Sequence, residues 1–231
     1  MAFIPSIINW LNTKRMISID LFKTYPYEVQ LETFMNLVNY AENTFWGQKY
    51  NYHKIESVKQ YQETVPVGTY TELEPYIEKL RNGDKDLLWP GEIKWFAKSS
   101  GTTSSKSKFI PVSREALEEC HFRGGKDVLA IYSRMKPDTK VFAGRGLTLG
   151  GSHRVNNFSN SSLYGDLSAI LIENLPLWAD LMKSPRAKIA LIEDFEEKME
   201  KIATRTVNQN IRYLAGVPSW FLVLLKYILE Y

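Results

Sequence analysis

The chain has 231 residues, of which 44% are hydrophobic and 24% are charged, and its net charge is +3. This composition is typical of a soluble globular protein with a buried core, in one or two domains. The charge is too small to indicate a nucleic-acid groove, and no stripe of basic residues interleaved with aromatic ones stands out, so nucleic acid is not expected as a partner.

The expected compartment is the cytoplasm. Cys120 is the only cysteine, which excludes an intramolecular disulfide and favours a reducing environment. We expect this thiol to be buried as a small apolar group. Residues 1–10 lack the basic start of a signal peptide. The most apolar run, Trp220 to Leu229, is about half the length of a bilayer span and contains Lys226, so no membrane association is expected.

Helical patterns open the chain. Apolar residues share one face at helical spacing near the N-terminus, at Phe3, Ile7, Ile8 and Leu11. The same pattern returns between Tyr27 and Phe45. Pro66 then interrupts the helical pattern. Thr69 can cap a short helix that runs through Leu80 and ends at Asn82-Gly83.

A polar run between two apolar segments follows. Ile93–Ala97 and Phe109–Val112 are predicted as strands, so Ser99–Lys108 becomes a strand-to-strand turn. Gly101 lies among five hydroxyl side chains, which belong to Ser99, Ser100, Thr102, Thr103 and Ser104. The glycine lets backbone N–H groups approach an anion, the hydroxyls add donors, and the lysines add charge. The run is therefore a candidate polyphosphate loop.

Two other interpretations of this run compete with the phosphate loop. Stretches rich in serine, threonine, glycine and lysine are also typical of plain surface loops. The Walker loop fits poorly, because Ser105 stands before Lys106 where that motif requires its second glycine, and an apolar strand follows instead of a helix.

The second half is predicted to alternate short strands with helices. Ser113 starts a helix that contains Leu117 and Cys120. Short strands are then expected at residues 140–144, 147–151 and 168–172, followed by a helix at about 185–202. On that helix, Asp194–Lys198 and Glu197–Lys201 are expected to form solvent-exposed pairs. Residues 213–221 indicate a strand, a tight turn and a helix.

Three sequence patterns suggest a dinucleotide site or a metal site, but the neighbouring residues argue against each of them. Gly144, Gly146 and Gly150 approach a dinucleotide fingerprint, but a strand-like run follows Gly146 where a helix would have to begin. The acidic cluster at residues 193–197 fits a solvated helix face without any metal. The histidines are far apart and none has a partner at i+3 or i+4, so zinc is not expected.

The string KWFAKSSGTTSSKSKFIPVS, Lys94 to Ser113, resembles the phosphate loop of the auxin-responsive Gretchen Hagen family of acyl acid amido synthetases and its bacterial relatives, within the adenylate-forming superfamily. Further ordered matches are VPVGTYTELEPYIEKL (65–80), LTLGGS (147–152) and LAGVPSWF (214–221). Ser105 departs from the glycine that many plant members carry.

This resemblance implies an α/β fold, the N-terminal portion of an adenylate-forming enzyme with helices packed on a mixed β-sheet. Residues 1–231 would form the N-terminal part of the large adenylating domain, because the family's later motifs and its small C-terminal domain are not found. The implied function is ATP-dependent activation of a small carboxylic acid through an acyl-adenylate, followed by amide formation with an amino acid. The 231 residues alone are expected to be inactive.

The resemblance also assigns site residues. The phosphates of ATP would be held by Ser99, Ser100, Gly101, Thr102, Thr103 and Lys108, with Lys108 as the catalytic charge. Mg²⁺ would share the phosphate oxygens, and no protein ligand is assigned to it within the chain. The acid would contact His121, Phe122, Gly151, Val217, Pro218 and Ser219. From the residues alone, Gly216–Ser219 is better explained by a plain strand-to-helix turn with Ser219 as N-cap, and only the resemblance favours a role in binding.

Other functions remain open at this point. The chain could belong to a nucleotide-binding or interaction module without catalysis, or to an acyl-CoA ligase. The acid, the amine and the oligomeric state are not specified by the sequence.

Overall fold

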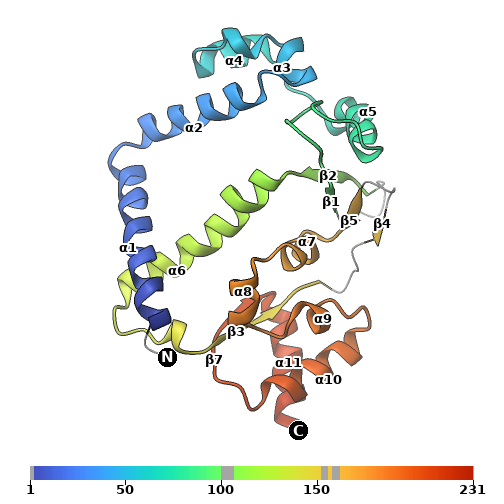
Figure 1. Ribbon diagram of the computed structural model, residues 1–231. Coiled ribbons are helices and arrows are strands. Elements are labelled where there is room, and N and C mark those ends of the chain that lie inside the picture. Colours follow the sequence, from blue (N-terminus) through green and yellow to red (C-terminus); the bar gives the residue numbers. More distant parts are fainter. Residues whose placement is uncertain (1–2, 100–106, 152–155, 158–161, 231) are drawn as a thin grey trace. The chain divides into compact units, whose positions relative to one another are not determined.

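A computed structural model describes residues 3–99, 107–151, 156–157 and 162–230 (Figure 1). The chain divides into two compact units. The hairpin unit comprises residues 13–120 and 157–164, and the parallel-sheet unit comprises residues 1–12, 121–156 and 165–231. The predicted mixture of helices with a mixed β-sheet is confirmed.

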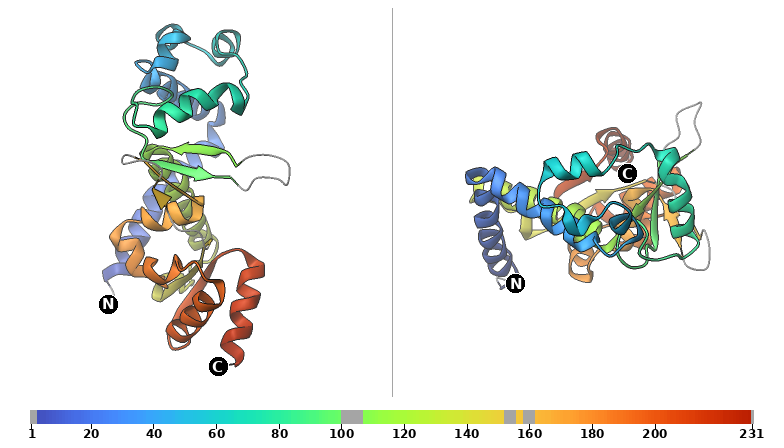
Figure 2. Two further views of the ribbon diagram at one scale, coloured as in Figure 1. Left: turned by 90° about the vertical axis from the view of Figure 1, so that its right-hand side faces the viewer. Right: turned by 90° about the horizontal axis from the view of Figure 1, so that it is seen from above.

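The hairpin unit is named for its two antiparallel strands. Its elements, including those that cross its boundaries in sequence, are α1 (Phe3–Thr24), α2 (Pro26–Ala41), α3 (Phe45–Lys49), the 3-10 helix η1 (Tyr52–Lys54), α4 (Val58–Thr64), α5 (Tyr70–Arg81), β1 (Trp95–Lys98), β2 (Phe109–Val112), β4 (Asn156–Asn157) and β5 (Leu163–Gly165). The strand order is β2-β1-β5-β4, with Lys98 opposite Phe109. The antiparallel strands β1 and β2 lie side by side in Figure 2, left. The two strands predicted around the polar run are confirmed.

Helix α5 packs beside this hairpin. It begins at a capping box, in which the Thr69 N–H donates to the Glu72 carboxylate over 2.6 Å. It is followed by Gly83 at φ 100°, as the glycine after its last turn predicts. Four buried residues join α5 to the strand region, namely Ile77, Leu80, Ile93 and Phe96. Burial of these side chains fixes the helix against β1.

The parallel-sheet unit contains most of the remaining helices. Its elements are the π-helix η2 (Ala116–Phe122), which begins in the hairpin unit, α6 (Arg123–Met135), the 3-10 helix η3 (Val141–Ala143), β3 (Arg145–Leu149), α7 (Leu167–Glu173), α8 (Leu177–Met182), β6 (Lys183–Ser184), α9 (Ala187–Ala190), α10 (Phe195–Thr206), β7 (Ile211–Gly216) and α11 (Pro218–Glu230). Strand β3 lies between β6 and β7 and is parallel to both. Its core joins β3 to α10 and α11 through Leu147, Leu149, Met199, Ile202, Phe221 and Leu224.

Three predicted elements of this unit were wrong in type or extent. Residues 168–172 form most of helix α7 rather than a strand, because a short apolar run has no period of its own to distinguish the two. Residues 141–143 form η3, and the strand starts only at Arg145. The single helix expected at 185–202 is two helices, since α9 ends at Ala190 and Asp194 caps a new helix, α10.

The structure also bears on the environment of the single cysteine and on the length of the apolar helices. Cys120 is exposed, so its predicted burial was wrong; it lies in η2, whose buried residue is Leu117. Among the residues that the structure describes, no helix has both the length and the apolar character needed to cross a bilayer.

Candidate functional site

The two ends of the polar run meet where the hairpin strands finish. The Ser99 N–H donates to the Lys108 carbonyl over 2.8 Å, and the Lys108 N–H donates to the Ser99 hydroxyl over 3.0 Å. Ser100, Gly101, Thr102 and Thr103 lie outside the described residues. Of the predicted phosphate-loop residues, the structure therefore places Ser99 and Lys108, and it places them side by side.

The Lys108 end is anchored on helix α5. The Lys108 side chain is exposed, and its Nζ lies 5.4 Å from the centroid of the Tyr70 ring. The next residue, Phe109, donates its N–H to the Tyr70 hydroxyl over 3.0 Å. The Phe109 ring also meets the Tyr164 ring edge to face, and the Arg81 guanidinium lies 3.9 Å from its centroid. Several aromatic contacts thus fix the strand next to the lysine.

A second group of predicted residues lies at the carboxyl edge of the parallel sheet. Leu149 at the end of β3 is opposite Gly216 at the end of β7. Gly150-Gly151 and Val217–Ser219 therefore leave the sheet at the same edge, which is where open α/β sheets bind ligands. The structure brings together Gly151 and the turn that the resemblance assigned to one acid pocket.

Backbone packing sets the distance between these two strand ends. Gly216 has φ 153°, and a Cβ atom placed on it would lie 2.2 Å from the Leu149 carbonyl oxygen. A residue with a side chain cannot be accommodated there without moving the backbone. The pairing of β3 with β7 therefore requires glycine at position 216.

The turn after Gly216 differs from expectation in its cap. Helix α11 begins at Pro218, and the Trp220 and Phe221 N–H groups donate to the Val217 carbonyl. Val217 therefore occupies the capping position and Pro218 the first helical position, where proline needs no hydrogen-bond acceptor. Ser219 lies in the first turn, so its interpretation as N-cap was wrong. Residues 217–219 are exposed, while Phe221 is buried.

A buried lysine holds the end of β3. Lys198 on α10 is 1% exposed, and its Nζ donates to the carbonyls of Gly150, over 3.2 Å, and Gly151, over 2.8 Å. Its predicted solvent-exposed pair with Asp194 was wrong, because the Asp194 carboxylate accepts the Glu197 N–H as the helix cap. The pair Glu197–Lys201 is confirmed.

The spacing of α10 could have revealed this lysine. Position 198 shares the helix face of Phe195, Met199 and Ile202, so the apolar stripe includes it. Burial lowers the pKa of Lys198, and the carboxylate of Asp166 opposes that shift. A buried ammonium on this face requires polar partners, which the two carbonyls supply.

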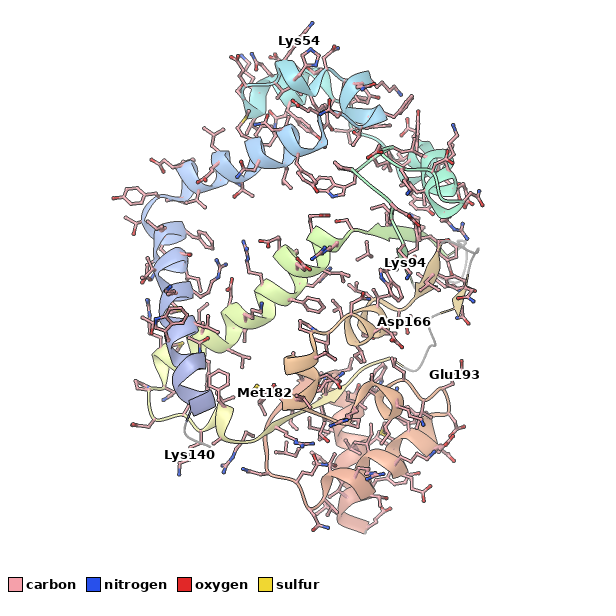
Figure 3. The ribbon with its side chains drawn as sticks, in the orientation of Figure 1. Lys54, Lys94, Lys140, Asp166, Met182 and Glu193 are labelled. Atoms are coloured by element: carbon pink, nitrogen blue, oxygen red, sulfur yellow. The ribbon has the colours of Figure 1, made fainter. Side chains whose placement is uncertain are left out.

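Helix α7 holds the backbone amide of Gly151, whose carbonyl is bound by Lys198. Its N–H donates to the Ser168 hydroxyl over 3.0 Å. A Cβ atom on Gly151 would lie 2.7 Å from the Asp166 carboxylate, which precedes α7 (Figure 3). Since both the amide and the carbonyl of Gly151 are used internally, this edge is suited to lining a pocket by shape rather than to binding phosphate through free N–H groups.

His121 and Phe122 are the remaining residues that the resemblance assigned to the acid pocket. Both are half-buried at the end of η2, just before α6. In the described part of the chain, neither makes a hydrogen bond, ion pair or ring contact with the β3 or β7 ends.

Candidate metal ligands are not clustered in the described part of the chain. No group of three or more His, Cys, Asp or Glu side chains is found there that could hold a metal ion.

Comparisons with known proteins agree with the sequence resemblance. The family model "GH3 family N-terminal domain" matches residues 15–226. Jasmonoyl–L-amino acid synthetase JAR6 of Nicotiana attenuata is 26% identical over 159 residues, which cover 62% of this chain and 27% of that protein. Indole-3-acetic acid-amido synthetase GH3.2 of Arabidopsis thaliana is 28% identical over 108 residues, covering 46% of this chain and 20% of that protein.

Solved structures show the same fold. The GH3.15 acyl acid amido synthetase matches with a TM-score of 0.75 at 19% identity, over 93% of this chain and 38% of that chain. A second structure, AtGH3.15 in complex with 2,4-DB, matches with a TM-score of 0.68 at 20% identity, over 88% of this chain and 36% of that chain. The chain thus spans well under half the length of the relatives it matches.

Proposed function

The chain belongs to the GH3 family, and from this membership we propose that it is the N-terminal part of an acyl acid amido synthetase. The full-length protein would activate a small carboxylic acid with ATP and join it to an amino acid. Relatives named as jasmonoyl and indole-3-acetic acid amido synthetases support this class of reaction. The short coverage of those relatives supports assigning the complete activity to a longer protein.

The proposed reaction has two steps. A carboxylate oxygen attacks the α-phosphorus of ATP, the new P–O bond forms, and pyrophosphate leaves with the electrons of the broken bond. The amino group then attacks the acyl carbonyl, AMP leaves, and the nitrogen loses a proton. The protein's main tasks are to align the reactants and to offset the negative charge of the phosphates.

The observation that carries the proposal is the closed hairpin end at Ser99 and Lys108. Two hydrogen bonds join these residues, and the Lys108 side chain remains exposed. We call the hydrogen-bonded pair Ser99 and Lys108 the hairpin neck. An ammonium at this position, next to a glycine- and hydroxyl-rich sequence, is suited to bind the β- and γ-phosphates. Ser99, Ser100, Gly101, Thr102 and Thr103 would supply neutral donors. Mg²⁺ would be held by the phosphate oxygens and would offset part of their charge.

The acid is proposed to lie against the carboxyl edge of the parallel sheet. Gly151, Val217, Pro218 and Ser219 would line its pocket, and His121 and Phe122 would complete it. The pairing of Leu149 with Gly216 supports the first four, because it joins their segments at one edge. The contribution of His121 and Phe122 depends on the family resemblance alone.

Acid-dependent pyrophosphate exchange in the full-length protein tests the phosphate assignment. We expect Lys108→Ala to cost about 2 kcal/mol in kcat/KM for ATP, roughly thirtyfold, because a charge-assisted contact is lost. Lys106→Ala is the matched control, since the family pattern gives that lysine no role. Thermal midpoints should hardly change, because Lys108 is exposed. Equal activity of the two variants would contradict the assignment of Lys108.

The acceptor is tested with the same protein. With ATP and a productive acid present, amino acids should yield an amide and release AMP. Product formation with coenzyme A but with no amino acid would instead identify an acyl-CoA ligase.

A further inference from the structure

Helix α5 meets the hairpin at its first residue. Tyr70 follows directly after Thr69, the capping residue, and the Glu72 carboxylate accepts from both the Thr69 N–H and the Thr69 hydroxyl. These bonds fix the first turn of the helix, where the backbone donors have no partner within the helix. Tyr70 is therefore presented from a rigid backbone rather than from a loop.

The hydroxyl of Tyr70 holds the backbone beside Lys108. Strand β2 is the outermost strand in its sheet order, and outward-facing N–H groups of such a strand find no partner in a neighbouring strand. The Tyr70 oxygen accepts the Phe109 N–H over 3.0 Å. This bond fixes the strand at the residue next to Lys108.

The ring of Tyr70 also faces the Lys108 side chain. The distance from Lys108 Nζ to the ring centroid is 5.4 Å, within the range of a cation–π attraction. An exposed lysine otherwise samples many rotamers, and ordering it costs conformational entropy on binding. The ring reduces this cost because it favours conformations in which the ammonium lies over its face.

A ring is also a suitable partner for a group that must attract phosphate. A carboxylate would neutralise the lysine, whereas an aromatic face leaves the positive charge intact. Among the described residues, no carboxylate forms an ion pair with Lys108. Its three N–H donors therefore remain available to an anion.

We propose that Tyr70 is the positioning residue for Lys108. It holds Lys108 at the hairpin neck through one hydrogen bond from the Phe109 N–H to its hydroxyl and one contact between its ring and the Lys108 ammonium. This inference rests on the proposed function, in which Lys108 faces the phosphates of ATP. In this role Tyr70 acts through Lys108.

A double-mutant cycle in the full-length protein tests this role. The readout is pyrophosphate exchange, with KM for ATP and KM for the acid measured separately for wild type, Tyr70→Leu, Lys108→Ala and the double variant. We expect Tyr70→Leu to raise KM for ATP about fivefold in the wild-type background, with little change in KM for the acid. In the Lys108→Ala background the same substitution should have almost no further effect.

Two more variants separate positioning from folding. Tyr70→Phe keeps the ring but loses the hydroxyl, so we expect a rise in KM for ATP of about twofold. Tyr76→Leu is the matched control, because Tyr76 lies on the same helix and also faces a lysine, with Lys49 Nζ 5.7 Å from its centroid. It should leave KM for ATP unchanged. If Tyr70→Leu does not fold, the cycle is run with Tyr70→Phe.

The outcomes distinguish the inference from the proposed function. Lys108→Ala impaired but Tyr70→Leu as active as wild type would overturn the positioning role and leave the function in place. Equal losses from Tyr70→Leu in both backgrounds, or equal changes in KM for ATP and for the acid, would indicate a structural role only and would also overturn it. Normal exchange by Lys108→Ala would overturn the phosphate assignment, and the inference with it.

Discussion

The neck of the hairpin and the carboxyl edge of the parallel sheet are held in place by different kinds of contact. At the hairpin, Ser99 and Lys108 are joined by two hydrogen bonds, and the Lys108 side chain lies in solvent over the Tyr70 ring. At the sheet edge, Gly216 contacts the Leu149 backbone directly, and buried Lys198 binds successive carbonyls. Substitution of Gly216 or Lys198 should therefore reduce stability, whereas substitution of Lys108 should reduce activity with little effect on stability.

The largest effect should come from Gly216→Ala. The new Cβ would lie 2.2 Å from the Leu149 carbonyl oxygen at a φ of 153°, so β3 and β7 would have to separate or shift. We expect the free energy of unfolding to fall by about 3 kcal/mol or more, measured by urea denaturation. Gly125→Ala is the control, because it lies within α6 with no atom near its Cβ, and it should stabilise the protein by about 0.5–1 kcal/mol. Similar unfolding midpoints for both variants would contradict the close approach.

Lys198→Met should have the next largest effect. The substitution keeps the length of the side chain but leaves the Gly150 and Gly151 carbonyls without their buried donor. A loss of about 3 kcal/mol in the free energy of unfolding is expected. Lys201→Met on the same helix removes only the exposed pair with Glu197 and should cost less than about 0.5 kcal/mol. A Lys198 variant as stable as the Lys201 variant would show that the sheet edge does not depend on this lysine.

The smallest effect concerns the cap that presents Tyr70. Hydrogen bonds from the Thr69 N–H and hydroxyl lower the pKa of Glu72 from its ordinary value of 4.5. A lowered folded-state pKa stabilises the protein above the unfolded value, and this contribution is lost as the pH falls through the folded value. The stability difference between wild type and Glu72→Gln should therefore shrink between about pH 7 and about pH 3, as followed by thermal unfolding. A difference that grows as the pH falls would have the wrong sign for this cap.

Local signals predicted the hairpin unit well. Thr69, the apolar face and Asn82-Gly83 delimited α5, and two apolar segments around a polar run indicated β1 and β2. Such signals lie within a few residues of the structure they specify. The contact between Tyr70 and Phe109 joins residues that are 39 apart in sequence, so no local pattern indicated it.

The parallel sheet depends on pairings that local patterns do not encode. The apolar run at 168–172 is compatible with a strand or a helix. Its packing in the folded protein determines that it forms the helix α7. Lys198 was assigned to the solvent because the charges of α10 suggested surface pairs, although its position fell on the apolar stripe. The position of Gly151 and Val217–Ser219 at one edge of the sheet was anticipated only through the family resemblance, and their role toward the acid stays a prediction.

The burial of Lys198 gives the protein an internal chemical reporter. Acylating reagents attack the free, neutral amine of a lysine, and the Nζ of Lys198 is held against two carbonyls with 1% of the residue exposed. The amine becomes reactive only when α10 separates from the end of β3. Its rate of acylation, relative to that of exposed Lys201, would therefore measure how often this part of the molecule opens under native conditions.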